Sequence, residues 1–156
     1  MFKSTILFLT TSLCSIGLSA DIQVGNSFFS HPGLEANLQE LPIEMAVGTA
    51  IELRYFLDEK TEALYMMAST DAVVSREMIE KHPMLMPYKV TNVEQNGQSL
   101  YVTLEVSKKN PEFMQPFVNQ VLRVEYLEDK TALLLVMSSD EASEEVNQTL
   151  HEIKIS

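Results

Sequence analysis

The chain has 156 residues, of which 46% are hydrophobic, and its formal net charge is −11 at pH 7. One of its 11 basic residues, Lys3, lies in the N-terminal leader described below, so the rest of the chain is more acidic still. We therefore expect no nucleic-acid partner, because proteins bind a phosphate backbone by neutralising it with Lys and Arg. An acidic excess of this kind is typical of a small protein that stays soluble through self-repulsion.

The first 20 residues have the pattern of a secretory signal peptide. Lys3 precedes a mostly apolar run over 6–18, and the small residues Ser19 and Ala20 follow, as expected before a cleavage site. The run is shorter than the roughly 20 residues that a membrane-spanning helix needs. The pattern predicts a periplasmic or secreted protein with no stable membrane insertion after cleavage. Cleavage also removes Cys14, the one cysteine, so stability must come from the core.

The mature chain begins with a segment that has no clear hydrophobic period. Residues 21–41 contain several turn-forming residues, among them Gly25 and Pro32. We predict an irregular leader or a short edge strand here, with one or two helical turns over 34–41. Residues 42–156 are long enough to form one further unit, which the patterns below predict to be a single α+β domain.

Two segments of this domain resemble each other. Residues 57–72 and 127–142 are identical at seven of sixteen aligned positions, including the sequence Lys-Thr after a pair of acidic residues. The similarity predicts an internal ββα duplication with copies at about 42–82 and 111–154. Upstream of the acidic turn the copies align only if the first has one extra residue, which we expect in a bulge or a longer hairpin loop.

Each copy is predicted to contain a hairpin followed by a helix. The strands are expected at 49–57 and 63–68 in the first copy, and at 118–127 and 132–138 in the second. Ser69 in the first copy, and Ser138 or Ser139 in the second, are candidate helix N-caps. The second helix shows an apolar stripe at helical spacing, formed by Ala142, Val146, Leu150 and Ile153.

A middle hairpin is predicted over 88–106. Its strands flank Asn96-Gly97, a dipeptide that favours a type I′ turn, and apolar residues alternate along the second strand. The fold class is therefore α+β, with about six antiparallel strands in hairpins and two helices packed against the sheet. One curved sheet and a two-lobed pseudo-symmetric arrangement both fit the pattern.

The mature chain contains three histidines, and none has the spacing of a known metal or nucleophile motif. No catalytic residue and no cofactor is therefore predicted. The alternative of a hydrolase stays open, because the members of a Ser-His-acid triad meet only in three dimensions.

One local sequence suggests a metal. His82, Met84 and Met86 lie close together, and in an extended segment the two thioethers would point the same way. Soft sulfur ligands favour Cu(I), so a periplasmic copper-binding protein is the first alternative to the leading hypothesis, ahead of the hydrolase. The competing interpretation is that these methionines fill gaps in the core.

Aromatic and methionine residues near the second copy suggest a surface for a partner. The candidates are Tyr88, Phe113, Met114 and Phe117, which together would form an adaptable apolar patch. With export and no catalytic motif, the leading hypothesis is a non-enzymatic binding or structural module. Its expected partner is a protein or a small apolar ligand, and the sequence does not determine its oligomeric state.

Overall fold

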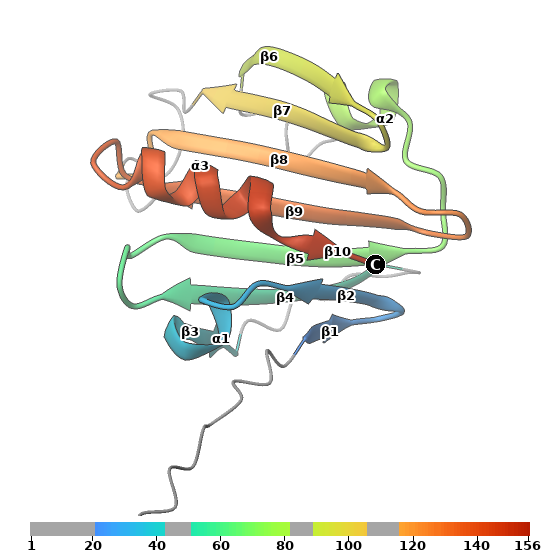
Figure 1. Ribbon diagram of the computed structural model, residues 1–156. Coiled ribbons are helices and arrows are strands. Elements are labelled where there is room, and N and C mark those ends of the chain that lie inside the picture. The colour runs from blue at the N-terminus through green and yellow to red at the C-terminus, as the bar shows by residue number, and fades with distance from the viewer. Residues whose placement is uncertain (1–20, 43–50, 82–88, 106–115) are drawn as a thin grey trace, which may run out of the picture.

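The computed structural model describes residues 21–42, 51–81, 89–105 and 116–156. The strands within these ranges are β1 (Ile22–Val24), β2 (Ser27–Ser30), β3 (Leu38–Leu41), β4 (Ile51–Asp58), β5 (Leu64–Thr70), β6 (Lys89–Asn96), β7 (Ser99–Glu105), β8 (Asn119–Tyr126), β9 (Thr131–Ser138) and β10 (Lys154–Ile155). The helices are α1 (Leu34–Asn37), α2 (Arg76–Glu80) and α3 (Ser143–Glu152). Seven strands form one antiparallel sheet in the order β3-β4-β5-β9-β8-β7-β6, and a smaller sheet has the order β1-β2-β10 (Figure 1).

The α+β class is confirmed, since the described chain is mostly antiparallel sheet with a few helices. The expected count of about six strands is too low, because ten are present in the described ranges. Six of them, β4 to β9, form the three hairpins that alternation predicted. The other four, β1, β2, β3 and β10, are at most four residues long, which is too short for a period to stand out.

The segment 21–41 is not an irregular leader. β1 and β2 form a hairpin with a two-residue loop, in which Gly25 has a φ of +56° that favours glycine. A Cβ at Gly25 would lie 3.3 Å from the Cβ of Ser69, so the loop packs closely on the large sheet. β10 extends the small sheet on the other side of β2, and β3 pairs with β4 at the edge of the large sheet. The predicted helical turns are limited to α1.

The internal duplication is not confirmed, because the two hairpins have different loops. Four residues separate Asp58 from Ala63, whose carbonyl accepts a hydrogen bond from the Asp58 N–H. Two residues separate Leu127 from Lys130, which are bonded in the same way. The first loop is thus longer by two residues rather than one, and this difference changes the register of the return strand relative to the sequence alignment.

The sequence alignment matches residues that lie on opposite faces of the sheet. Met67 and Met137 are aligned in the sequence, yet Met67 lies in the core cluster on one face and Met137 in the cluster on the other. The helices differ in the same way, since α3 packs on the first cluster through Val146 and Leu150, and α2 packs on the second through Ile79. A rotation that superposed the hairpins would leave the two helices on opposite faces.

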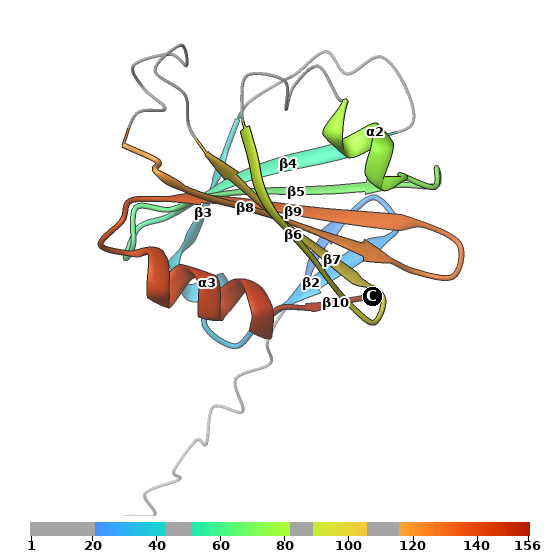
Figure 2. The same cartoon turned by 90° about the horizontal axis from the view of Figure 1, so that it is seen from above.

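The seven-stranded sheet therefore has two covered faces, and Figure 2 shows α3 with the small sheet on one side and α2 on the other. We call the side beneath α3 the first face and the side beneath α2 the second face. The first core cluster joins Val24 and Phe29 of the small sheet to alternate residues of β5, β8 and β9. The second cluster consists mainly of the intervening residues of β7, β8 and β9.

Two local predictions need correction. Asn96 pairs with Ser99, so the loop of the middle hairpin is Gly97-Gln98 rather than Asn96-Gly97. Gly97 has a φ of +60°, whereas the φ of Gln98 is not positive. A type I′ turn needs a positive φ at both central residues, so this loop is a type II′ turn.

The predicted N-caps of the helices are also displaced. Ser69 lies inside β5, and the side chain of Ser75 instead caps α2 by accepting a hydrogen bond from the N–H of Met78. α3 begins only at Ser143, while Ser139 bonds the Ala142 N–H in the turn before it. Within the described ranges, none of the helices is both long enough and apolar enough to cross a membrane.

Candidate functional site

Three rows of side chains cross the second face, each with one residue from β4, β5, β9, β8, β7 and β6 in that order. The first row is Leu57, Leu64, Met137, Gln120, Leu104 and Val90; the second is Tyr55, Met66, Leu135, Leu122, Val102 and Val93; the third is Leu53, Ala68, Leu133, Val124, Leu100 and Gln95. Cross-strand neighbours point to the same side of a sheet. Apart from two glutamines, these rows are aliphatic or aromatic throughout.

The first face is more polar, although more of the described chain covers it. Its rows include Arg54, Glu52 and Ser69 on β4 and β5, and Arg123 and Glu125 on β8. On β6 it is entirely polar. Nevertheless α3, α1 and the three-stranded sheet all pack here. Hydrophobic burial therefore does not by itself explain why more of the described chain packs on the first face than on the second.

On the second face the described cover consists of α2, Val74 just before it, and Phe117 just before β8. This helix has five residues, and among its described side chains only Ile79 is buried, at 3% exposure. A helix this short is not stable by itself, so Ile79 is its anchor. Its neighbours Met78 and Val73 are 53% and 79% exposed, and Ile51 at the start of β4 is also exposed.

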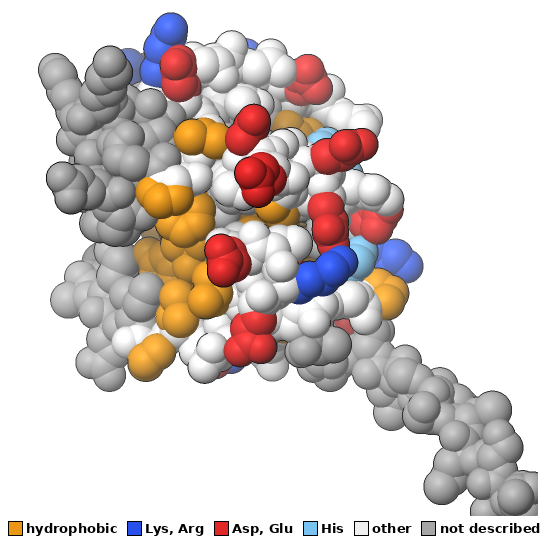
Figure 3. All heavy atoms as spheres, turned by 90° about the vertical axis from the view of Figure 1, so that its left-hand side faces the viewer, with side chains coloured by type: hydrophobic (Ala, Val, Ile, Leu, Met, Phe, Trp, Pro, Cys, Tyr) orange, Lys and Arg blue, Asp and Glu red, His pale blue; other side chains and the backbone are white. Residues whose placement is uncertain are grey.

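Apolar side chains reach the surface at the other end of the strands as well. Leu57, Leu64 and Met66 are only partly buried where β4 ends and β5 begins. Figure 3 views the molecule from that side and shows apolar side chains gathered in one area, with acidic side chains distributed around it. The second face is therefore an apolar layer that stays partly accessible at both ends of its strands.

Gln120 is the exception in the centre of the first row. Its side chain is fully buried, and its Nε2 donates a hydrogen bond to the Phe117 carbonyl at 3.1 Å. Its Oε1 has no hydrogen-bond partner among the residues that the structure describes. The residues paired with Gln120 on the two adjacent strands, Leu104 and Met137, have no side-chain donor to offer. Since most buried polar atoms are paired, this oxygen requires an explanation.

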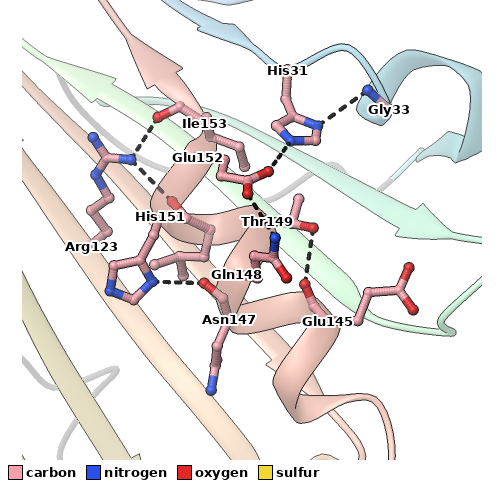
Figure 4. A network of polar contacts seen from close by, with 11 residues as sticks. His31, Gly33, Arg123, Glu145, Asn147, Gln148, Thr149, His151, Glu152 and Ile153 are labelled. Carbon is pink, nitrogen blue, oxygen red and sulfur yellow. Dashed lines mark hydrogen bonds and ion pairs between the residues drawn. The ribbon is translucent and has the colours of Figure 1, made fainter.

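The first face contains a polar network beneath the C-terminal end of α3 (Figure 4). Arg123 donates to Glu125 at 2.8 and 3.0 Å, and to the carbonyls of Leu150 at 3.0 Å and Ile153 at 2.6 Å. Ser99 donates to the same carboxylate at 2.6 Å. A cation here is favourable because the last carbonyls of a helix lack intrahelical partners and carry partial negative charge. We interpret the network as a structural anchor for α3.

His31 and Glu152 connect α3 to the segment after β2. The Gly33 N–H donates to His31 Nδ1, so Nε2 carries the proton and donates to Glu152 at 3.0 Å. This hydrogen bond, with another from Gln148, lowers the pKa of Glu152. Because Nδ1 already accepts from the backbone, it is not available as a general base without loss of that contact.

The remaining described histidine is also held by structural contacts. The ring of His151 stacks on Tyr101 with centroids 4.5 Å apart, and its Nδ1 donates to the Asn147 carbonyl. Among the described residues neither His31 nor His151 is hydrogen-bonded to a serine, so the hydrolase alternative has no assembled triad in this part of the chain.

The predicted metal ligands His82, Met84 and Met86 all lie outside the described residues, so the copper alternative stays a prediction. Elsewhere in the described ranges, no group of three or more His, Cys, Asp or Glu side chains is arranged to hold a metal ion.

Of the predicted partner-binding residues, Tyr88, Phe113 and Met114 also lie outside the described ranges. Phe117 is described, just before β8, where its side chain packs partly buried against the second core cluster. The sequence analysis missed Gln120. The alternation of Leu122, Val124 and Tyr126 was the signal that could have found it, because it places Gln120 on the same apolar face.

Comparisons with protein-family models, with characterised proteins and with solved structures find no match to this chain. The function must therefore be argued from the site.

Proposed function

We propose that the protein is an exported, non-enzymatic binding module that holds a small apolar ligand on the second face of its large sheet. The observation that supports this most is the mismatch between the two faces. The face whose three rows are apolar apart from two glutamines is covered, among described elements, by one five-residue helix, whereas the more polar face carries α3 and a second sheet.

A small ligand fits this surface better than a folded protein does. Most side chains of the three rows are buried or partly buried, so they do not present the broad exposed patch that marks a protein interface. The exposed apolar residues, including Val73 and Met78, lie around α2 at the margin of the face. Small-molecule sites are mostly apolar with a few polar groups, and the rows have that composition.

The predicted export is consistent with such a role. Outside the cytoplasm a small apolar compound is surrounded by water, and transfer to an apolar protein layer is favourable by roughly 25 cal/mol for each Å² buried. The acidic surface would keep the carrier dispersed without interfering with a neutral ligand.

Two matched leucine variants test the proposal. Leu133 is partly buried against the second core cluster, and Leu127 is partly buried against the first. The assay follows the fluorescence of a neutral naphthylamine probe, which rises in apolar surroundings. We expect saturable binding with one probe per chain. Leu133→Gln should weaken it by about tenfold, because an unpaired amide in an apolar site costs roughly 1–3 kcal/mol.

Leu127→Gln is the control, since it introduces the same group on the other face and should leave the probe affinity within about twofold of the original. The proposal fails if the folded protein shows no saturable binding, or if the two variants weaken it equally. Circular dichroism of both variants establishes that each is folded.

A further inference from the structure

We infer that the ligand of the second face is a small amphiphile with an apolar body and one hydrogen-bond donor, a hydroxyl or N–H group, that Gln120 Oε1 accepts. This inference rests on the proposed function and specifies the ligand class. It starts from a buried oxygen in the centre of an apolar row, for which the described part of the chain offers no hydrogen-bond partner.

The orientation of the Gln120 amide is fixed by its other end. Nε2 donates to the Phe117 carbonyl at 3.1 Å, which assigns the nitrogen and leaves Oε1 as the unpaired atom. A buried acceptor without a donor costs about 1–3 kcal/mol. An apolar residue at this position would avoid that cost, so the oxygen is expected to have a donor in the working state of the protein.

A buried water molecule is a poor donor at this position. Ordered buried waters make about three hydrogen bonds to polar groups. The cross-strand neighbours of Gln120 are Leu104 and Met137, and the next residue on the same face of β8 is Leu122. These side chains offer no such bonds. A ligand that needs only one hydrogen bond and contacts apolar groups elsewhere matches these surroundings better.

The rows also set the size of the apolar body. From Gln120 to Val124, four residues along β8, the distance is roughly 14 Å at about 3.4 Å per residue. The second and third rows lie along this path and are apolar on every central strand. A linear chain of on the order of ten carbons, with its hydroxyl at Gln120, would cover all three rows.

The test compares 1-decanol with its methyl ether, which has a similar apolar body but no donor. Each competes against the naphthylamine probe on the full-length mature chain. The native protein should bind the alcohol about tenfold more tightly than the ether, as expected for one hydrogen bond to a buried acceptor. Gln120→Met keeps the length of the side chain but removes the amide, and it should bind both compounds equally.

Gln148→Met is the matched control, because Gln148 is exposed on α3, which covers the first face, and the variant should keep the preference for the alcohol. Equal binding of alcohol and ether by the native protein would overturn the inference. A preference for the alcohol that persisted in Gln120→Met would overturn it too. Either result leaves the proposed function intact. If neither compound competes with the probe, and the probe itself does not bind, both conclusions fall. The comparison on the native protein does not depend on the folding of any variant.

Discussion

Replacement of Arg123 with methionine should be among the most destabilising changes in this protein. The side chains of Arg123 and Glu125 are only 9% and 11% exposed, so their ion pair is largely removed from water. Methionine would leave the carboxylate with Ser99 as its hydrogen-bond donor among the described side chains, and it would remove the donor from the carbonyls of Leu150 and Ile153. Breaking a buried ion pair from one side costs about 3–5 kcal/mol.

Urea denaturation of the mature chain measures this loss. For a small domain the free energy of unfolding falls by roughly 1–3 kcal/mol per molar urea, so the midpoint should fall by about 2 M. The double variant Arg123→Met with Glu125→Met should recover part of the loss, because no unpaired charge is then buried. A single variant within about 1 kcal/mol of the original, or a double variant that is less stable than the single, would refute this account of the network.

Two further predictions concern a pair of turns and an ion pair. In the same urea assay, Gly25→Ala should lower the free energy of unfolding more than Gly97→Ala does. Both glycines have a positive φ, but only a Cβ at Gly25 would meet neighbouring atoms. Equal losses of stability would show that the close approach to Ser69 is unimportant. The hydrogen bond from Arg54 lowers the pKa of Glu40, so its contribution is present above the unfolded-state pKa and is lost as the pH falls through the folded-state value. Glu40→Gln should therefore melt below the original protein at pH 7, and the gap should narrow as the pH falls below 4.5; a gap that did not narrow on acidification would contradict this.

The three central hairpins were predictable because their strands are long enough for alternation to be visible. β7 shows this most clearly, with Leu100, Val102 and Leu104 on one face and Tyr101 and Thr103 on the other. The helical stripe in α3 was predictable for the same reason, since Val146, Leu150 and Ile153 are all buried as expected.

The faces of the sheet were not predictable from the repeat. A local alignment shows which residues resemble each other, but the pairing of each strand in the sheet decides which side a residue faces. The alignment matches Leu57 with Leu127 and Met67 with Met137, and in each pair the two residues lie on opposite faces of the sheet. The short strands β1, β2 and β10 depend on pairing between distant segments, which no local pattern reports.

The candidate site was only partly accessible to sequence reasoning. Phe117 was singled out for its apolar character, and it does pack against the second core cluster. Gln120 was not, because a single glutamine in a strand is unremarkable until the register shows which face it occupies and what surrounds it.

The central claim is that an apolar ligand lies on the second face, and methyl NMR shifts along β9 test it most directly. Consecutive residues of this strand alternate between the faces, so Leu133 and Leu135 lie on the second face while Leu134 and Val136 lie on the first. On titration with the naphthylamine probe, we predict saturable shifts for the methyl groups of Leu133 and Leu135, and little change for those of Leu134 and Val136. Shifts confined to Leu134 and Val136, or no saturable shift on either face, would contradict the account.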